Sequence, residues 1–305
     1  MANFTAADVK NLREQTGCGM MDCKKALTES NGDVEKALQF LREKGLAAAE
    51  KKASRIAAEG LVVSLVEGKV GVVLEVNAET DFVAKNETFV EFVNNVAKTI
   101  IKNNPASVEE LGGMHCENTD MTVTEALNDR ILVIGENMKI RRFSRMEGNL
   151  VPYVHGGGKI GVLVNFDTDC ADKEEFATVG KDVAMQIAFS NPSYLNESEV
   201  PAEVVEKEKE IIKAQMENDP KMANKPEKVK EGIINGRIGK VFQEICLLDQ
   251  PFVKEEKINV KQYVADAAKA MGGKMEIVSF VRIEKGEGLE KREDNFADEV
   301  ASMMK

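Results

Sequence analysis

Residues 77–86 read Asn-Ala-Glu-Thr-Asp-Phe-Val-Ala-Lys-Asn and join two segments of different periodicity. Two apolar runs, 61–67 and 70–76, come before this stretch and are separated by Gly68-Lys69, which predicts a β-hairpin. The apolar residues after the stretch recur at helical spacing: Phe89, Phe92, Val93, Val96 and Ile100. We therefore expect a surface corner between a strand and a helix, where a rigid scaffold can present side chains to a partner.

Phe82 is the unusual residue of this corner. A large apolar ring that stays exposed has a free-energy cost unless another surface covers it. The pattern leaves two interpretations open. Either the ring turns inward as part of the core, or it faces a binding partner.

An internal repeat bears on this choice. Residues 68–74, Gly-Lys-Val-Gly-Val-Val-Leu, are echoed by residues 158–164, Gly-Lys-Ile-Gly-Val-Leu-Val. Thr80-Asp81-Phe82 is followed by Phe89, and Thr168-Asp169-Cys170 is followed by Phe176. We therefore expect two related α+β halves side by side. In this alignment Cys170 stands in the place of Phe82, which indicates that the fold does not need Phe82 and favours a functional role for it.

The bulk properties exclude several classes of protein. The chain has 305 residues, enough for two or three domains, and its 41 basic and 52 acidic residues give a net charge of -11. This balance argues against direct binding of nucleic acid, which needs a concentrated basic surface. No apolar run approaches the roughly 20 residues of a membrane span, and the N-terminus lacks the apolar region of a signal peptide. We expect a cytoplasmic protein whose scattered cysteines are free thiols.

Helical patterns dominate the N-terminal region. Residues 5–44 predict three short helices, with Asp22 and Asp33 capping the second and the third, and residues 46–59 predict a helical linker. The loop between the first two helices carries Met20 and Met21. These side chains either fill the small core or form an adaptable contact surface.

The rest of the chain mixes strands and helices. Residues 201–218 and 226–247 have apolar stripes on otherwise charged helices, which predicts a projecting antiparallel helical hairpin. The other expected segments are a helical stretch at 108–128, a strand meander at 138–146, 150–155 and 159–166, helices at 173–189 and 260–271, a strand at 275–283 and an amphipathic end at 296–304.

A search for catalytic motifs finds little. Gly156-x-Gly158-x-x-Gly161 matches a dinucleotide-binding pattern, but it leads into a predicted strand, whereas the pyrophosphate needs a helix N-terminus. We interpret it as a hairpin turn. His115-Cys116 has no second pair at metal spacing, and His155 fits a solvated strand end unless a partner reaches it. The sequence therefore indicates a binding protein that is not an enzyme and needs no metal or cofactor.

Several longer motifs occur together in a fixed order. They are residues 12–27, Thr80-Asp81-Phe82-Val83-Ala84-Lys85, Gly135-Glu136-Asn137, His155-Gly156 with residues 159–164, and Gln250-Pro251-Phe252-Val253. On these motifs the chain resembles, nearly end to end, the bacterial translation elongation factor Ts family, the guanine nucleotide exchange factors of elongation factor Tu. The helical hairpin departs in length and detail from better-known members, with Asp219-Pro220-Lys221 in its turn.

The resemblance implies an α+β fold with a duplicated core of antiparallel strands. The implied domains are an N-terminal three-helix ubiquitin-associated-like domain at 1–54, a core N-subdomain at 55–140, a core C-subdomain at 141–190 and 236–285, a helical-hairpin (coiled-coil) arm at 191–235 and a C-terminal helical module at 286–305.

The resemblance also implies the function and the residues that perform it. In this family the corner matching Thr80, Asp81, Phe82 and Val83 wedges into the nucleotide domain of GDP-bound elongation factor Tu. The wedge disturbs the magnesium and phosphate sites, so that GDP leaves and GTP can bind. The implied supporting contacts are Met20, Met21, Lys24, Lys51, Asn137, His155 and Phe296, and a homodimer through the arm is a further implied assembly.

Two other functions stay open at this point. A scaffold or chaperone-like protein would bind partners through the helical arm and the Met20-Met21 loop without changing nucleotide release. An enzyme would use the glycine turn together with His155.

Overall fold

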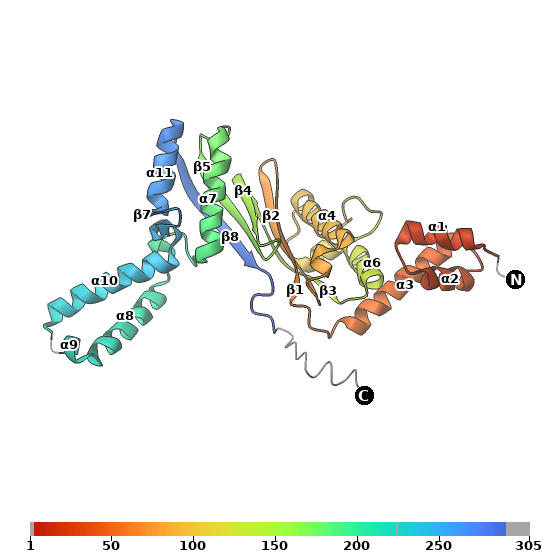
Figure 1. Ribbon diagram of the computed structural model, residues 1–305, viewed down its shortest axis with the longest axis horizontal. Helices are drawn as coiled ribbons and strands as arrows, with labels where there is room; N and C mark the ends of the chain where they lie inside the picture. Colours follow the sequence, from red (N-terminus) through yellow and green to blue (C-terminus); the bar gives the residue numbers. More distant parts are fainter. Residues whose placement is uncertain (1–2, 224, 291–305) are drawn as a thin grey trace.

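The computed structural model describes residues 3–223 and 225–290. The molecule is elongated, with a helical domain at one end, two β-sheets in the middle and a helical hairpin at the other end (Figure 1). The helices are α1 (Ala6–Thr16), α2 (Met20–Glu29), α3 (Val34–Lys52), α4 (Glu87–Asn103), α5 (Val108–Gly112), α6 (Val123–Ile134), α7 (Glu174–Ser190), α8 (Ala202–Glu217), α9 (Pro220–Ala223), α10 (Glu227–Ile245) and α11 (Val260–Met271). Short 3-10 helices are η1 (Val83–Lys85), η2 (Glu197–Glu199) and η3 (Leu247–Asp249).

The strands are β1 (Glu59–Glu67), β2 (Val70–Ala78), β3 (Met138–Glu147), β4 (Asn149–His155), β5 (Ile160–Thr168), β6 (Pro251–Phe252), β7 (Glu255–Asn259) and β8 (Met275–Glu284). The predicted α+β class with antiparallel strands is confirmed. The domain limits stay a prediction, and two of them fall inside single elements, the limit at 140 inside β3 and the limit at 235 inside α10.

Helices α1 to α3 form the N-terminal bundle. The side chain of Asp33 accepts from the N–H of Lys36 and caps α3, as predicted. The predicted cap at Asp22 is wrong, because α2 begins earlier, after Gly19, and Asp22 forms an ion pair with Lys44 of α3 instead. The predicted linker helix is also wrong as a separate element, because α3 continues without a break to Lys52.

The N-terminal bundle shares its core with the rest of the protein. Leu132 and Val133 of α6 pack against the buried residues of α1 to α3. Gly45 lies so close to α6 that a Cβ at this position would be 3.2 Å from the backbone oxygen of Asn128. Helix α6 therefore serves both the N-terminal bundle and the central core.

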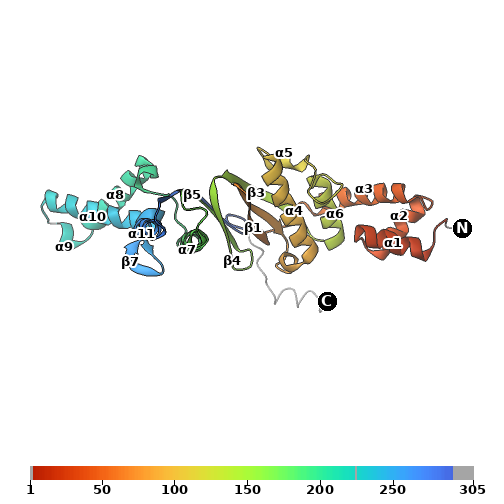
Figure 2. The same cartoon turned by 90° about the horizontal axis from the view of Figure 1, so that it is seen from above.

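The central core contains two three-stranded antiparallel sheets with the orders β1-β2-β3 and β4-β5-β8. The predicted meander of three consecutive strands is wrong, because β3 pairs with β2, whereas β4 pairs with β5 in the other sheet. The turn between β3 and β4 thus carries the chain from one sheet to the other. Helices α4 and α6 pack on the first sheet, and α7 and α11 pack on the second (Figure 2).

Glycines allow the two sheets to approach closely. A Cβ at Gly161 of β5 would lie 2.5 Å from Cγ1 of Val62 in β1, and one at Gly71 of β2 would lie 2.9 Å from Leu150. The backbone N–H of Val62 also donates to the carbonyl of Gly158 at 2.9 Å, which links the sheets directly. The glycines repeated in the two halves are therefore contact points between them.

The helical hairpin forms as predicted. Helices α8 and α10 bury Ile212, Met216, Ile234 and Ile238 between them, and α9 closes the turn. At its base, the carboxamide of Gln250 accepts from Gln186 of α7 at 3.1 Å and donates to the carbonyl of Glu244 at 2.8 Å. The sequence motif that begins at Gln250 therefore anchors the arm to the second half of the core.

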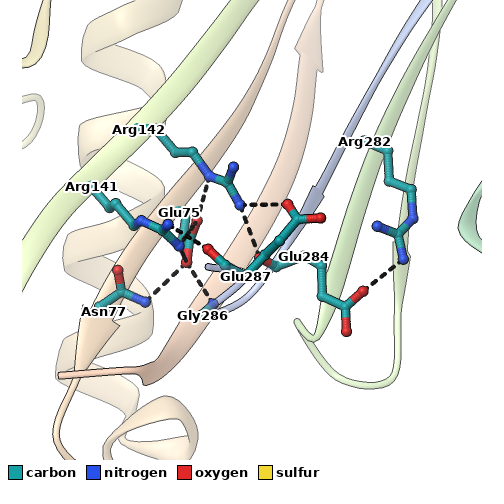
Figure 3. A network of polar contacts seen from close by, with 8 residues as sticks. All are labelled: Glu75, Asn77, Arg141, Arg142, Arg282, Glu284, Gly286 and Glu287. Carbon is teal, nitrogen blue, oxygen red and sulfur yellow. Dashed lines mark hydrogen bonds and ion pairs between the residues drawn. The ribbon is translucent and has the colours of Figure 1, made fainter. Parts of the chain in front are cut away.

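A buried carboxylate joins the end of β8 to the first sheet (Figure 3). The side chain of Glu75 in β2 is fully buried. It accepts hydrogen bonds from Asn77 Nδ2 at 3.0 Å, Arg141 Nη1 at 3.0 Å, Arg142 Nε at 2.7 Å and the backbone N–H of Gly286 at 2.7 Å. A β-bulge between β2 and β3 at this point brings two consecutive arginines to one carboxylate.

The same arginines hold the chain after β8. Arg142 Nη2 donates to the carbonyl of Glu284 and to the carboxylate of Glu287, and Arg141 Nη2 donates to the carbonyl of Glu287. Gly286 has φ 70, and a Cβ there would lie 2.4 Å from the carbonyl oxygen of Ala58. We name the contacts of Glu75, Asn77, Arg141, Arg142 and Gly286 the Glu75 cluster.

Replacing Glu75 with Ala should destabilise the protein by about 3 kcal/mol, because it leaves two partly buried guanidinium groups without their carboxylate. Urea denaturation gives the free energy of unfolding. Glu67→Ala, at the exposed end of β1, is the control and should change this free energy by less than about 0.5 kcal/mol. Equal losses in both variants would contradict a central role of the Glu75 cluster.

The Glu75 cluster also predicts a dependence of stability on pH. Burial alone raises the pKa of Glu75, but the hydrogen bonds from Gly286, Asn77, Arg142 and Arg141 outweigh this effect and hold the pKa below its ordinary value of 4.5. In the unfolded chain Glu75 therefore takes up its proton at a higher pH than in the folded chain. Its contribution is present above the ordinary pKa and is lost as the pH falls through the folded pKa.

Denaturation curves between about pH 6 and pH 3 should show this loss. The free energy of unfolding should decrease less on acidification in Glu75→Ala than in the native chain, while Glu67→Ala should follow the native chain. Parallel pH profiles for the native chain and Glu75→Ala would show that another group governs acid stability.

Candidate functional site

The stretch between β2 and α4 forms a surface corner, as predicted. Strand β2 ends at Ala78, the 3-10 turn η1 follows at Val83, and Asn86 caps α4 by accepting from the N–H groups of Thr88 and Phe89. The Phe82 side chain is 79% exposed, so its interpretation as a core residue is wrong. The corner presents an apolar ring to solvent.

The two neighbours of Phe82 differ in burial. Asp81 is exposed and forms a 3.6 Å ion pair with Lys85, which is also exposed. Val83 is only 4% exposed and packs into the core of the first half. Val83 therefore anchors the corner, whereas Asp81, Phe82 and Lys85 are exposed.

Two carboxylates hold the N-terminal side of the corner. The Glu136 side chain accepts from the N–H of Thr80 at 3.0 Å and from its hydroxyl at 2.7 Å. In the reverse direction, the Glu79 side chain accepts from the N–H of Asn137 at 2.6 Å. The corner is thus fixed to the segment between α6 and β3 by hydrogen bonds in both directions.

The segment after α3 joins this arrangement. Arg55 forms a 3.3 Å ion pair with Glu79, and its carbonyl accepts from Asn137 Nδ2 at 2.8 Å. Asn137 is only 8% exposed, and its side chain holds the segment after α3; its role as a partner contact stays a prediction. Lys51, in the last turn of α3, is exposed.

The predicted contacts of the N-terminal bundle lie on its surface. Met20 is 49% exposed and Met21 is 72% exposed, so their interpretation as core residues is wrong, and Lys24 is also exposed. These residues lie on α2, apart from the corner, but α6 connects the two places. It contributes Leu132 and Val133 to the bundle and leads directly into Glu136. Phe296 lies outside the described residues.

His155 ends β4 and is exposed, and its Nδ1 lies 3.0 Å from the hydroxyl of Tyr153. The glycines that follow it form a turn into β5, which confirms the interpretation as a hairpin turn. Gly158 in this turn accepts from the N–H of Val62 in β1. The structure therefore places the His155 turn against the sheet that carries the corner.

The second half contains a corner of different construction. Ala78 of β2 pairs with Met138, and Thr168 of β5 pairs with Met275, so Ala78 and Thr168 occupy equivalent positions. Cys170 is therefore equivalent to Thr80, and the sequence alignment that placed it opposite Phe82 is wrong. The path from Ala78 to α4 is longer than the path from Thr168 to α7, and Phe82 lies in that longer path.

In the second corner Cys170 is buried, while Asp169 stays exposed and closes on the segment before β8. The Asp169 carboxylate accepts from the N–H of Lys274 at 2.6 Å, and this bond, together with one from the Cys170 thiol, lowers the pKa of Asp169. A Cβ at Gly273 would lie 2.2 Å from Asp169 Oδ1 and 2.4 Å from Cys170 Sγ. Gly273, the counterpart of Glu136, thus leaves room for side chains that close this corner.

The chemistry available elsewhere is limited. Across residues 3–223 and 225–290, no three His, Cys, Asp or Glu side chains converge in a way that could hold a metal ion. No helix in the same ranges is long and apolar enough to span a membrane. All five cysteines are buried and free, and burial, followed by nearby carboxylates, raises the pKa of Cys246 to about 11.

Sequence reasoning missed Glu79, Glu136 and Arg55 as parts of the site. The motif Gly135-Glu136-Asn137 was the available signal, but a single carboxylate does not stand out in a chain with 30% charged residues.

Comparison with known proteins identifies close relatives of the whole chain. The profile of the family described as Elongation factor TS matches residues 79–287. A protein named Elongation factor Ts from Syntrophotalea carbinolica is 51% identical over 305 residues, which cover 99% of each chain. Proteins of the same name from Clostridium novyi and Clostridioides difficile are each 49% identical and cover 98% and 100% of both chains, respectively.

Gly273→Ala should destabilise the protein by about 1–3 kcal/mol, because the new methyl group collides with Asp169 and Cys170. Thermal or urea denaturation measures this effect. Gly236→Ala is the matched control, since Gly236 is an exposed residue of α10 and a Cβ added there would have no atom within 4 Å. This variant should stabilise the protein by up to about 1 kcal/mol. A harmless Gly273→Ala would contradict the tight closure of the second corner.

Proposed function

Because the chain belongs to the elongation factor Ts family, we propose that it binds GDP-bound elongation factor Tu and promotes the release of GDP, after which GTP binds. The observation that supports this proposal most strongly is the 79% exposure of Phe82 on a corner that is otherwise firmly anchored. An exposed apolar ring on a fixed backbone suits insertion into a pocket of another protein.

In the proposed mechanism, Asp81 and Phe82 wedge into the nucleotide domain of the partner and disturb its magnesium and phosphate sites. Nucleotide and exchange factor then favour different arrangements of one site, so each weakens the binding of the other. Loss of the magnesium ion removes a counter-charge from the diphosphate. No bond is made or broken by this chain, which acts as an exchange factor and not as an enzyme.

Phe82 alone is not sufficient for a large effect. Burying a Phe side chain contributes about 1.5–3 kcal/mol, whereas a thousandfold change in nucleotide affinity corresponds to about 4 kcal/mol. Exposed residues elsewhere must share the binding energy. We assign this role to the exposed residues Met20, Met21, Lys24, Lys51 and His155. Thr80 and Val83 hold the corner, and the buried Asn137 supports it by holding the segment after α3.

The helical arm carries a second proposed contact. It extends from the core at the end opposite to the N-terminal bundle (Figure 1). Its internal stripe is buried, while Ile211 and Val229 stay exposed on its surface. We propose that the arm forms a homodimer contact, and that the protein acts in the cytoplasm, where translation takes place. A scaffold function of the arm is the alternative.

Phe82→Ala should slow the release of fluorescent GDP from elongation factor Tu by about tenfold or more, because the ring no longer fills its pocket. Stopped-flow fluorescence at a saturating concentration of the factor measures this rate.

Phe189→Ala is the matched control, since this ring is 80% exposed but lies at the end of α7 in the second half. With Phe189→Ala, elongation factor Tu should release GDP at the rate seen with the native chain. If Phe82→Ala promoted GDP release at the native rate, the rest of the interface would be responsible for exchange. If the native chain did not accelerate GDP release, the scaffold alternative would be favoured.

A further inference from the structure

Glu136 makes the contacts that hold the start of the exposed corner. Its two carboxylate oxygens are used separately, one by the hydroxyl of Thr80 at 2.7 Å and the other by the Thr80 N–H at 3.0 Å. Contacts of a carboxylate with two donors of one residue fix both distance and orientation. Thr80 lies only two positions before Phe82, so its placement restricts where the ring can point.

Glu136 itself is attached to a rigid part of the fold. Helix α6 begins with a capping box between Thr122 and Glu125 and ends at Gly135, whose φ of 88 lies in the left-handed region that glycine adopts at little cost. Glu136 follows at once, and the chain then enters β3 through the buried Asn137 and Met138. The carboxylate is therefore presented by a segment that is anchored on both sides.

The second half of the protein provides an internal comparison. Both halves contain one common contact, a carboxylate that accepts from the backbone N–H before the last strand, Glu79 with Asn137 in the first and Asp169 with Lys274 in the second. The Glu136 contact has no counterpart, because Gly273 and Cys170 stand in the places of Glu136 and Thr80. The contact is present only in the half whose corner exposes a Phe ring, Phe82.

We infer that Glu136 is a positioning residue, which holds Thr80 so that Phe82 is presented in the orientation that the partner requires. This inference rests on the proposed exchange function. A corner that is already ordered loses less conformational freedom on binding, and a corner that samples many conformations binds with an affinity reduced by its competent fraction. Glu136 thus acts through Thr80 and need not touch the partner.

The first test uses the free full-length chain and hydrogen exchange of its amides. The Thr80 N–H is a direct reporter, because it donates to Glu136. In Glu136→Ala, this amide should exchange about tenfold faster, because it loses its acceptor. In Glu136→Gln the Thr80 amide should stay near the native rate, since the carboxamide can accept from the Thr80 N–H and donate to its hydroxyl.

Asp169→Ala is the matched control for this measurement. It removes the carboxylate of the second corner, so exchange should accelerate at Lys274 and leave residues 80–85 unchanged. Unchanged exchange at Thr80 in Glu136→Ala would overturn the inference, whether or not the chain promotes GDP release.

The second test measures GDP release from elongation factor Tu over a range of factor concentrations. Glu136→Ala should raise the concentration needed for half-maximal rate by about fivefold to tenfold and change the maximal rate by less than about twofold. Glu136→Gln should behave like the native chain. A general loss of folding would instead lower the melting temperature of Glu136→Ala and reduce the concentration of folded factor in the assay.

Two results of this kinetic test would overturn the inference. If Glu136→Gln were as defective as Glu136→Ala, the charge of Glu136 would act on the partner directly. If Glu136→Ala matched the native chain at every concentration, the contact with Thr80 would have no role in exchange. Failure of the native chain to accelerate release would refute the proposed function itself, and the amide exchange of Thr80 would still show whether Glu136 holds the corner.

Discussion

The close contact between the two sheets is the constraint on which the rest of the molecule depends. Gly71 and Gly161 have no side chain, so β2 and β5 approach the facing sheet far enough for Val62, Val73 and Leu163 to be fully buried. This contact brings the His155 turn against β1 and the end of β8 against Glu75. Segments far apart in the sequence therefore reach the same sheet.

The two halves share one plan, and the second half also contains the inserted helical arm. Each half has a hairpin, a helix, a later helix that ends in a left-handed glycine, and a last strand that pairs beside the hairpin. At the candidate site the two halves differ in the corner after the hairpin. A longer connection and a glutamate produce an open corner in the first half, whereas a shorter connection and a glycine produce a closed corner in the second.

Local patterns predicted the elements well and their partners less well. The hairpin before the corner, the α4 stripe and the arm were readable because periodicity is a local property of the chain. The pairing of β3 with β2 was not readable, since a short turn at Gly148 looks the same whether it joins strands of one sheet or of two. The shared dipeptides Thr80-Asp81 and Thr168-Asp169 led to an alignment of Cys170 with Phe82. This alignment is wrong, because only the strand register reveals the different lengths of the two corners. Glu136 was missed because its partner Thr80 lies far from it in the sequence.

The shared use of α6 has a consequence for how this architecture can evolve. A boundary near residue 54 looks like a joint between separate modules, yet Leu132 and Val133 complete the hydrophobic interior on the other side of it. Recombination near residue 54 would expose Leu132 and Val133 to solvent. The transferred bundle would lack these two side chains in its hydrophobic core. Substitutions on either side of the contact between the N-terminal bundle and α6 should therefore need matching changes on the other side.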